Sequence, residues 1–404
     1  MGMNCTSCKS PIHDVESEDR ISKRSFKLLF PIGEGGFGKV WKVIHKTTSI
    51  HYAMKEISKV KLYMKKSISL INQELLTLKS IRNFFISNIH FAFQTEEHLY
   101  IITDYFPGGD LRYHINNRYN KQFTQSEIQF ILACILLAVV HLHKHNIVHR
   151  DIKPENLVFD SKGYLHLTDF GVSKCVHNHN AGIIDKSGTI GYASPEAILG
   201  LRHSFTADYF SLGVVAYELL TGFRPFRGKS KHQIKEQLLT KTIHLKPADI
   251  PSDYEHNTNP IIICDLINSL LQRKVNNRLG VNGIDEIICH PFFEEFNWNA
   301  LFMQEMISPF QIRPGEHTTN NRKDMFERNQ FYLDEYWDIL NRIKREKVFA
   351  SFYYDSRIKC SKTTTSESNK ASLADEYECF SNYIHKVKSI KRNSGVSALS
   401  TKCD

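Results

Sequence analysis

The periodicity of apolar residues changes once along this chain, near Tyr105. Before that point, from residue 26, short runs of β-branched and aromatic residues are typical of strands. After it, apolar residues recur with the period of helices. We therefore expect an α+β fold with a small, mainly β lobe at 26–105 and a larger, mainly α lobe at 106–296. The helical segments predicted are 68–81 in the small lobe and 126–143, 211–220 and 261–272 in the large lobe.

The ends of the chain lie outside these two lobes. The 404 residues exceed what one compact core usually holds, which leaves room for appendages. Residues 1–25 are polar and lack a hydrophobic period, so we predict an N-terminal extension. A C-terminal tail covers 297–358, and within it 333–347 have a helical pattern. The Ser-, Thr- and Lys-rich stretch 359–404 is predicted to be disordered.

Composition narrows the class of protein without identifying a partner. Lys and Arg number 52 against 43 acidic residues, a formal charge of +9. Such a charge favours anionic membranes or acidic partners, although a solvated basic surface is the commoner explanation. Nine cysteines are scattered, and no second Cys-x-x-Cys pair accompanies Cys5 and Cys8, so we expect a reducing, intracellular protein without structural zinc. The apolar stretch 128–142 predicts a buried helix because it is too short to span a bilayer, and no secretory signal precedes it.

A glycine-rich run lies near the start of the small lobe, Gly33-Glu34-Gly35-Gly36-Phe37-Gly38-Lys39-Val40. Glycines let backbone N–H groups approach phosphates closely because no side chain intervenes. A glycine-rich hairpin with a purely structural role has the same pattern, so the run alone decides little. The candidate binding residues in and beside it are Ile32, Gly33, Gly35, Gly36, Phe37, Gly38 and Val40.

Two short loops in the large lobe carry the most specific chemistry. The run His149-Arg150-Asp151-Ile152-Lys153-Pro154-Glu155-Asn156 is followed, after an apolar stretch, by Asp169-Phe170-Gly171. Together they supply a base and two oxygen ligands for a hard metal ion. Phosphoryl transfer needs this set because the reaction depends mainly on positioning and charge neutralisation. The plainer explanation, two loop-capping aspartates, does not account for the complete set in this order.

These loops, in this order and at this spacing, resemble the catalytic and metal-binding loops of eukaryotic protein kinases. The resemblance implies the bilobal protein-kinase fold, with ATP as the phosphate donor and Mg²⁺ as the metal. Asp151 would then accept the proton of the substrate hydroxyl, Lys153 would stabilise the transferring phosphoryl group, and Thr189 would support both. Asn156 and Asp169 would hold Mg²⁺.

The same resemblance assigns the rest of the nucleotide site. Lys55, in Tyr-Ala-Met-Lys, would hold the α- and β-phosphates and would itself be oriented by Glu74. Glu56 is nearer in sequence, but strand alternation points it away from the lysine. A surface lysine at a strand end is the alternative for Lys55. The other positions implied are adenine contacts at Val40, Ala53 and Val158, a hinge from Asp104 to Phe106 preceded by the small residue Thr103, and Asp110 at the rim.

Two features bear on the substrate. Lys153 is typical of kinases of the Ser/Thr class, so we expect protein substrates that are phosphorylated on Ser or Thr. Asp110, Glu155 and Glu218 match positions that in related kinases contact basic residues upstream of the target. We therefore expect Arg or Lys upstream of the target residue. All three acids would serve ribose binding or loop structure equally well.

Residues 169–196 resemble an activation segment, and one position in it departs from the family pattern. Asp185 stands where many related kinases carry a phosphorylatable threonine. A carboxylate there would pair with Arg150 and order the loop without an activating kinase, though with less charge than a phosphate brings. The alternative is a solvated loop aspartate in an alignment that has slipped by one residue.

Two smaller departures concern packing. Ser194 replaces the alanine of the usual Ala-Pro-Glu, and Phe210 stands where a tryptophan is usual. We expect neither change to affect the chemistry. The resemblance also implies a structural ion pair between Glu196, at the end of the activation segment, and Arg278.

The run Gly-Gly-Asp-Leu-Arg-Tyr-His-Ile at 108–115 and the run His-Pro-Phe-Phe at 290–293 resemble the AGC group of kinases, and the first is especially similar to the YANK subgroup. In that group, two phenylalanines of the tail dock on the small lobe and hold the Glu74 helix inward. Phe349 and Phe352 match them, while Tyr353 occupies the slot where Ser or Thr is often phosphorylated. An unrelated aromatic cluster is an equally good explanation.

The N-terminus begins Met-Gly-Met-Asn-Cys-Thr, which fits the acceptor pattern for myristoylation of Gly2. One myristoyl chain gives only marginal membrane binding, so Cys5 and Cys8 are candidate palmitoylation sites for a second anchor. An unmodified polar N-terminus with two free thiols is the alternative.

We therefore expect a monomeric Ser/Thr kinase, cytoplasmic and peripheral on the cytosolic face of a membrane, with no nucleic-acid partner. The rival hypothesis is a membrane-tethered pseudokinase or scaffold that acts only by binding. Its mark would be the loss of Lys55, Asp151 or Asp169, and all three are present.

Overall fold

The small lobe is built on an antiparallel sheet to which the tail adds a strand. The computed structural model describes residues 20–118, 122–176, 182–250, 260–312 and 333–360. The sheet has the strand order β1-β2-β3-β5-β4-β10. Its strands are β1 (Phe26–Gly35), β2 (Gly38–His45), β3 (His51–Ser58), β4 (Ile89–Gln94), β5 (His98–Asp104) and β10 (Tyr354–Asp355), and the lobe's helices are the 3-10 turn Lys23–Ser25, α1 (Lys59–Met64) and α2 (Ile68–Ser80).

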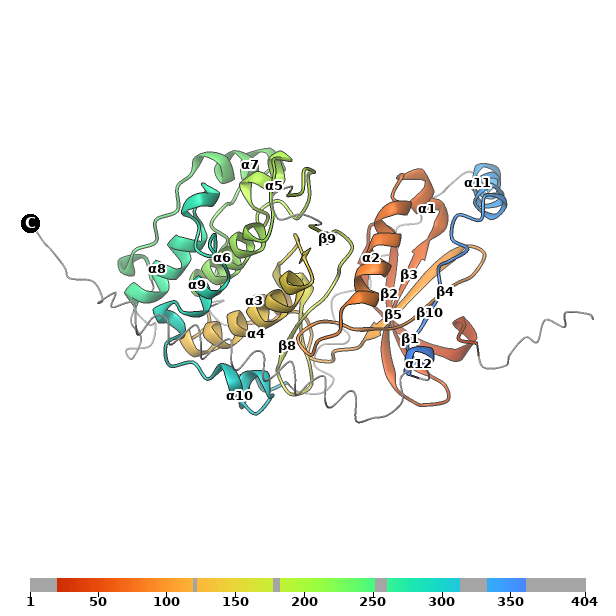
Figure 1. The fold of residues 1–404 in the computed structure, drawn as a ribbon, viewed down its shortest axis with the longest axis horizontal. Helices are drawn as coiled ribbons and strands as arrows, with labels where there is room; N and C mark the ends of the chain where they lie inside the picture. Colours follow the sequence, from red (N-terminus) through yellow and green to blue (C-terminus); the bar gives the residue numbers. More distant parts are fainter. Residues whose placement is uncertain (1–19, 119–121, 177–181, 251–259, 313–332, 361–404) are drawn as a thin grey trace, which may run out of the picture.

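Strand alternation gives the two faces of this sheet different neighbours. On one face Val43, Met54 and Ile102 are buried in a cluster separate from the main core. On the other face Ile57 belongs to the main core together with Leu75 of α2. Because side chains alternate along a strand, Lys55 shares the α2 side with Ile57, whereas Glu56 shares the opposite side with Met54. Figure 1 shows α2 lying across the sheet.

The large lobe is mainly helical, with two short antiparallel ladders, of which Figure 1 labels strands β8 and β9. The ladders are β6 (Ile147–Val148) with β9 (Lys174–Cys175), and β7 (Leu157–Phe159) with β8 (Leu165–Leu167). The helices are α3 (Leu111–Asn117), α4 (Gln125–Lys144), α5 (Pro195–Leu199), α6 (Thr206–Thr221), α7 (Lys231–Thr240), α8 (Pro260–Leu270), α9 (Asp285–Ile288) and α10 (Trp298–Phe302), with 3-10 turns at Pro154–Asn156, Pro247–Asp249, Val275–Asn277 and Pro291–Phe293.

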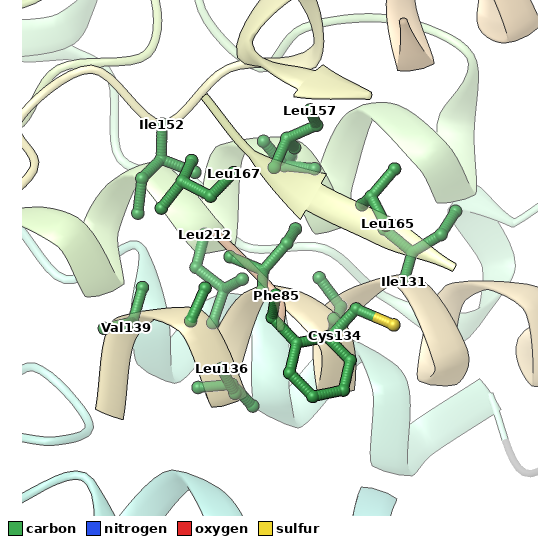
Figure 2. Close-up of a cluster of buried hydrophobic side chains, with 14 of the residues drawn as sticks. Phe85, Ile131, Cys134, Leu136, Val139, Ile152, Leu157, Leu165, Leu167 and Leu212 are labelled. Carbon is green, nitrogen blue, oxygen red and sulfur yellow. The ribbon is translucent and has the colours of Figure 1, made fainter. Parts of the chain in front are cut away.

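The core of the large lobe fixes the loop between β6 and β7. Figure 2 shows Ile152 of that loop among the buried side chains of α4, α6 and the β7–β8 ladder. Ile152 and Leu157 are fully buried and Leu167 is nearly so. Since Ile152 lies between Asp151 and Lys153, burial of its side chain turns those two polar side chains away from the core and holds their backbone in place.

Helix α4 is the centre of this core. It is long and apolar enough to span a membrane by length and composition, but 78% of its apolar window is buried inside the protein. It begins with a capping box, in which the Thr124 hydroxyl accepts from the Glu127 N–H and the Glu127 carboxylate accepts from the Thr124 N–H. The burial identifies α4 as a core helix, as the sequence predicts, although the helix is longer than the apolar stretch suggests.

The tail returns to the small lobe. Helix α11 (Leu333–Arg345), strand β10 and helix α12 (Ser356–Cys360) lie beside the sheet in Figure 1, although they are the last described elements of the chain. Strand β10 pairs antiparallel with β4. Phe349 and Phe352 are 3% and 2% exposed and belong to the main core, so they are docked residues rather than a separate aromatic cluster.

The predicted α+β architecture, with a mainly β small lobe and a mainly α large lobe, is confirmed. Each predicted helix is present, with ends that differ by a few residues. The predictions for residues 1–19 and 361–404 lie outside the described residues.

Candidate functional site

Three charged side chains meet between the lobes. The Nζ atom of Lys55 on β3 lies 2.6 Å from Oε1 of Glu74 on α2 and 3.1 Å from Oδ1 of Asp169, which follows β8. Glu74 is buried, whereas the Asp169 side chain is 49% exposed. Glu56 instead accepts from Lys23, Trp41 and Tyr100 on the far side of the sheet, so strand alternation excludes it, and Lys55 pairs with Glu74 as the resemblance implies.

The charges of this trio depend on one another. Burial alone would lower the pKa of Lys55, but the carboxylates of Asp169 and Glu74 outweigh it and hold that pKa above its ordinary value. The Lys55 ammonium in turn lowers the pKa of Asp169 to about 2. Lys55 is therefore a cation and Asp169 an anion at neutral pH, which is the protonation state that phosphate and metal binding require.

Both oxygens of Asp151 are held by hydrogen bonds. Oδ1 accepts from the backbone N–H of Thr189 at 2.9 Å and from its hydroxyl at 2.6 Å. Oδ2 accepts from Lys153 Nζ at 2.6 Å and from Asn156 Nδ2 at 3.1 Å. Lys153 also donates to the Thr189 hydroxyl at 2.8 Å. Four predicted site residues thus form one network, and the Asn156 side-chain oxygen is left for another ligand.

A buried aspartate that sequence reasoning did not assign to the site supports this loop. Asp208, at the start of α6, is fully buried and accepts from the backbone N–H groups of His149 at 2.9 Å and Arg150 at 2.8 Å. Arg150 has a φ of 69°, which is unfavourable for a residue with a side chain, so its backbone needs such an anchor. The signal available was an aspartate near the start of a mostly apolar helix.

The glycine-rich run forms the turn between β1 and β2, where Gly35 pairs with Gly38. A Cβ on Gly38 would lie 1.8 Å from the carbonyl oxygen of Glu56, so only glycine lets β2 approach β3 this closely. The turn also has a support that was not anticipated, because Lys65 Nζ donates to the Gly36 carbonyl at 2.8 Å and lies over the Phe37 ring. The other candidate positions in the turn, Ile32, Gly33 and Val40, are half-buried.

The predicted adenine positions lie on adjoining strands. Ala53 of β3 pairs with Thr103 of β5, and Val40 of β2 pairs with Lys55. Val158 of β7 is bridged to Asp110, the N-terminal cap of α3, whose carboxylate accepts from the Tyr113 N–H at 2.8 Å. Each of these pairings lies within one lobe, the first two in the small lobe and the third in the large lobe.

The side chains of two predicted hinge residues contact neighbouring strands or loops of the protein. The Asp104 carboxylate accepts from Asn88 at 2.8 Å and contacts His90 at 2.6 Å on the β4 side. Phe106 stacks on His166 of β8, with ring centroids 4.0 Å apart. A contribution of Asp104 to adenine binding therefore falls to its backbone, since its side chain is fully engaged in holding the hinge to β4.

Asp185 lies beside Arg150 in the activation segment. Arg150 Nη1 donates to Oδ1 of Asp185, and Lys174 Nζ donates to Oδ2 at 3.0 Å. Burial alone would raise the pKa of Asp185, but Lys174 and Arg150 hold it below its ordinary value. The Arg150 side chain is only 4% exposed, so the carboxylate provides the counter-charge for a buried cation.

The acidic residues expected to contact upstream basic residues of a substrate are engaged within the protein. Arg112 Nε lies 2.9 Å from Glu155, and Arg112 Nη1 lies 2.9 Å from Glu218. Asp110 caps α3. An internal arginine thus lies between the two glutamates, and the preference for Arg or Lys upstream of the target stays a prediction.

The phenylalanine at position 210, one of the two smaller departures from the family pattern, packs beside the ion pair of Glu196 with Arg278. Arg278, which is 1% exposed, binds Glu196 in a bidentate pair at 2.6 and 3.0 Å, as the resemblance implies. Phe210 is fully buried, stacks with Phe226 and lies under the Arg278 guanidinium at 5.0 Å. The smaller aromatic ring therefore leaves the ion pair intact.

The tail is anchored by polar as well as apolar contacts. Gln94 at the end of β4 donates to the Phe349 carbonyl at 2.6 Å, and Lys79 of α2 donates to the Tyr353 carbonyl at 2.9 Å. Tail and α2 are thus directly joined. The predicted acylation sites, Gly2, Cys5 and Cys8, lie outside the described residues.

Comparisons with known proteins agree with this geometry. Residues 26–293 match the family described as the protein kinase domain. A probable serine/threonine-protein kinase of Dictyostelium discoideum is 36% identical over 73% of this chain and 62% of its own length. Ribosomal protein S6 kinase 2 beta of Xenopus laevis and ribosomal protein S6 kinase alpha-2 of Homo sapiens are each 34% identical, over 74% and 75% of this chain but only 46% and 40% of their own lengths.

Proposed function

Because the chain belongs to the protein kinase family, we propose that it is an ATP-dependent serine/threonine protein kinase. The observation that carries the proposal is the complete network around Asp151, together with the ion pair of Lys55 with Glu74. The chain spans less than two thirds of the length of the curated relatives named above, so the activity of those larger proteins is not transferred as a whole. The S6 kinases among them support the AGC-group resemblance, and the YANK subgroup stays a prediction.

In the proposed reaction the substrate hydroxyl oxygen bonds to the γ-phosphorus of ATP while the bond to the β–γ bridging oxygen breaks and ADP leaves. Asp151 accepts the hydroxyl proton, because its oxygens are oriented by Thr189 and Lys153. Lys153 also offsets negative charge on the transferring group. Lys55, fixed by Glu74, positions the phosphates that stay on the nucleotide.

The donor set suits Mg²⁺. Asp169 offers an ionised and half-exposed carboxylate, and Asn156 offers an amide oxygen whose partner nitrogen is bound to Asp151. Among the described residues no cluster of three His, Cys, Asp or Glu side chains forms a complete cage for a metal. Mg²⁺ commonly takes one or two protein oxygens and completes its shell with phosphates and water, and when bound it neutralises phosphate charge.

A membrane-tethered pseudokinase or scaffold is the competing proposal. It would keep the fold and lose a group needed for transfer. Lys55, Asp151 and Asp169 are all present and each has the partners described above, which favours the enzyme.

The Asp185 contacts support a second part of the proposal, basal activity that needs no phosphorylation of the activation segment. The aspartate supplies the anion that Arg150 and Lys174 bind. A related role is proposed for the docked tail, in which Phe349 and Phe352 help to hold α2, and with it Glu74, against β3.

The proposed location is the cytosolic face of a membrane, with the kinase acting there as a monomer on protein substrates. The sequence around Gly2, Cys5 and Cys8 supports it through the acylation pattern. The formal charge of +9 is consistent with an anionic surface.

The deciding experiment measures Mg²⁺-dependent transfer of ³²P from ATP to a degenerate mixture of Ser and Thr peptides by the full chain. Asp151→Asn should abolish transfer, because the amide cannot accept the hydroxyl proton. Asp265→Asn, a change at an exposed aspartate whose ion pair among the described residues is with His290, serves as the matched control and should leave the rate unchanged. If neither the wild type nor Asp151→Asn transferred phosphate to peptide at any Mg²⁺ or ATP concentration, the scaffold would be favoured.

A further inference from the structure

A pocket of about 390 Å³ lies beside the catalytic loop, lined by residues of α3, the turn at Pro154–Asn156 and the end of α6. Glu155 in its wall follows Lys153 by two residues. Arg224 in its wall reaches the end of the activation segment, where its Nη1 would lie 3.0 Å from a Cβ on Gly191. The pocket is therefore placed to receive a substrate side chain close to the phosphorylated residue.

The two acidic groups of this pocket share one internal cation. Arg112 bridges them, with Nε at 2.9 Å from Glu155 Oε1, Nη1 at 2.9 Å from Glu218 Oε1 and Nη2 at 3.1 Å from Glu218 Oε2. Tyr192 donates its hydroxyl to Glu218 at 2.5 Å. Glu218 is 4% exposed, so a second cation has no free carboxylate oxygen of Glu218 to bind.

Two further arginines face the pocket without an acidic partner among the described residues. Arg224 lies with its guanidinium 5.8 Å from the Tyr192 ring centroid. Arg227 lies 4.9 Å from the ring centroid of Phe223, which is 55% exposed. The ion pairs formed between described residues include neither arginine. Stacking on aromatic rings leaves their N–H donors available to an anion.

The balance of charge decides which side chain the pocket accepts. Its wall contains three arginines, at 112, 224 and 227, against two glutamates, so its formal charge is 3 − 2 = +1. A substrate arginine would meet like charges and would compete with Arg112 for Glu155 and Glu218. A substrate carboxylate or phosphoryl group would meet two available guanidinium groups.

We infer that this kinase selects substrates with an anionic side chain, a carboxylate or a phosphorylated residue, upstream of the target Ser or Thr, and that Arg112 excludes basic residues from the same pocket. The inference rests on the proposed kinase function. It differs from the expected preference for upstream Arg or Lys, because Arg112 contacts both Glu155 and Glu218.

The test uses the full chain with Mg²⁺ and ATP and a peptide set that differs only at the second and third positions before the target serine. These positions carry Arg, Ala, Glu or phosphoserine. The kcat/KM for the Glu peptide should exceed that for the Arg peptide about tenfold, and the ratio should fall as salt is raised because the charges are partly exposed. Comparison of the phosphoserine peptide with the Glu peptide shows whether the pocket prefers a phosphoryl group or a carboxylate.

Two variants assign the preference to named residues. Arg227→Gln, at an exposed position, should raise the KM for the Glu peptide about fivefold and leave the Ala peptide unchanged. Arg112→Ala should free both glutamates and shift the preference toward the Arg peptide. Arg118→Ala, which removes an arginine on the other side of α3 that pairs with Glu127, is the matched control and should keep the wild-type order.

The outcomes separate the two proposals. If the wild type phosphorylates the Arg peptide better than the Glu peptide, the inference is overturned while the kinase function stands. The same holds if Arg227→Gln lowers kcat/KM for all peptides equally. If no peptide is phosphorylated above the Asp151→Asn background, the kinase function fails and the inference fails with it.

Discussion

The pairing of Asp185 with Arg150 gives a prediction about regulation that can be worked from the structure. Replacing Asp185 with alanine removes the carboxylate from Arg150, whose side chain is 4% exposed, and from Lys174. Arg150 then keeps the hydrogen bond from Nε to the Val172 carbonyl at 2.7 Å. The activation segment loses one of the contacts that tie it to the catalytic loop, while those of Thr189 with Asp151 and Lys153 remain.

The size of the effect follows from the burial of the two partners. A hydrogen bond to a charged group contributes about 1.5–3 kcal/mol. The Asp185 side chain is 36% exposed, so solvent screening reduces this to about 1–2 kcal/mol. That free energy corresponds to about a five- to thirtyfold change in the population of the ordered segment, and kcat/KM should fall by a similar factor.

The assay compares kcat/KM and the melting temperature of the wild type, Asp185→Ala and Asp185→Glu after phosphatase treatment. Asp265→Ala is the control for loss of an exposed aspartate. The alanine variant should lose activity with little change in melting temperature, and the glutamate variant should recover most of it. Wild-type activity abolished by phosphatase, or an unaffected alanine variant, would refute the reasoning.

The pH dependence offers an independent check. The pKa of Asp185 is held below its ordinary value, so the stabilisation from its carboxylate is complete above the unfolded value of about 3.9 and is lost only as the pH falls through the lowered folded value. A phosphothreonine would titrate near pH 6 instead. We therefore expect the wild type and Asp185→Ala to show the same dependence of activity on pH near pH 6.

Three further outcomes are expected. Glu74→Gln should lower kcat/KM for ATP about ten- to a hundredfold, because Lys55 loses a charged partner at 2.6 Å. Glu305→Gln, at an exposed site, should leave this value unchanged. Steady-state kinetics with varied ATP at saturating peptide measure both variants. Phe349→Ala should destabilise tail docking by about 3–5 kcal/mol and expose the tail to limited proteolysis, whereas Trp337→Ala, at a side chain 49% exposed, should not. Gly2→Ala should move the protein from the membrane to the soluble fraction of cells, and equal membrane fractions would contradict acylation.

Much of the fold could be predicted because it depends on local patterns. The strands of the small lobe and helix α4 are encoded by the periodicity of their own residues and by caps such as Thr124. The alternation that separates Lys55 from Glu56 is likewise local, so the sequence excluded Glu56, whereas the resemblance to kinases supplied Glu74 as the partner. Strand β10 could not be found in this way, since two residues paired with a distant strand have no period of their own.

The candidate site also has a part that the sequence predicts and a part that only the fold reveals. The residue types at Asp151, Lys153, Asn156 and Asp169 are sufficient to indicate phosphoryl transfer, because that chemistry requires a base, a cation and oxygen ligands in a fixed order. The anchoring of this loop by Asp208 was not visible, because a helix 57 residues beyond Asp151 supplies the acceptor.

The sequence by itself determined the two-lobed architecture and the groups available for catalysis, since periodicity and residue type are properties of short segments. Only the tertiary structure decided which charges remain available. Glu155 and Glu218 are acidic in sequence, yet folding brings Arg112 between them, and Asp104 turns toward His90. A charge acts through its nearest partner, and in this protein those partners come from segments far apart in the chain.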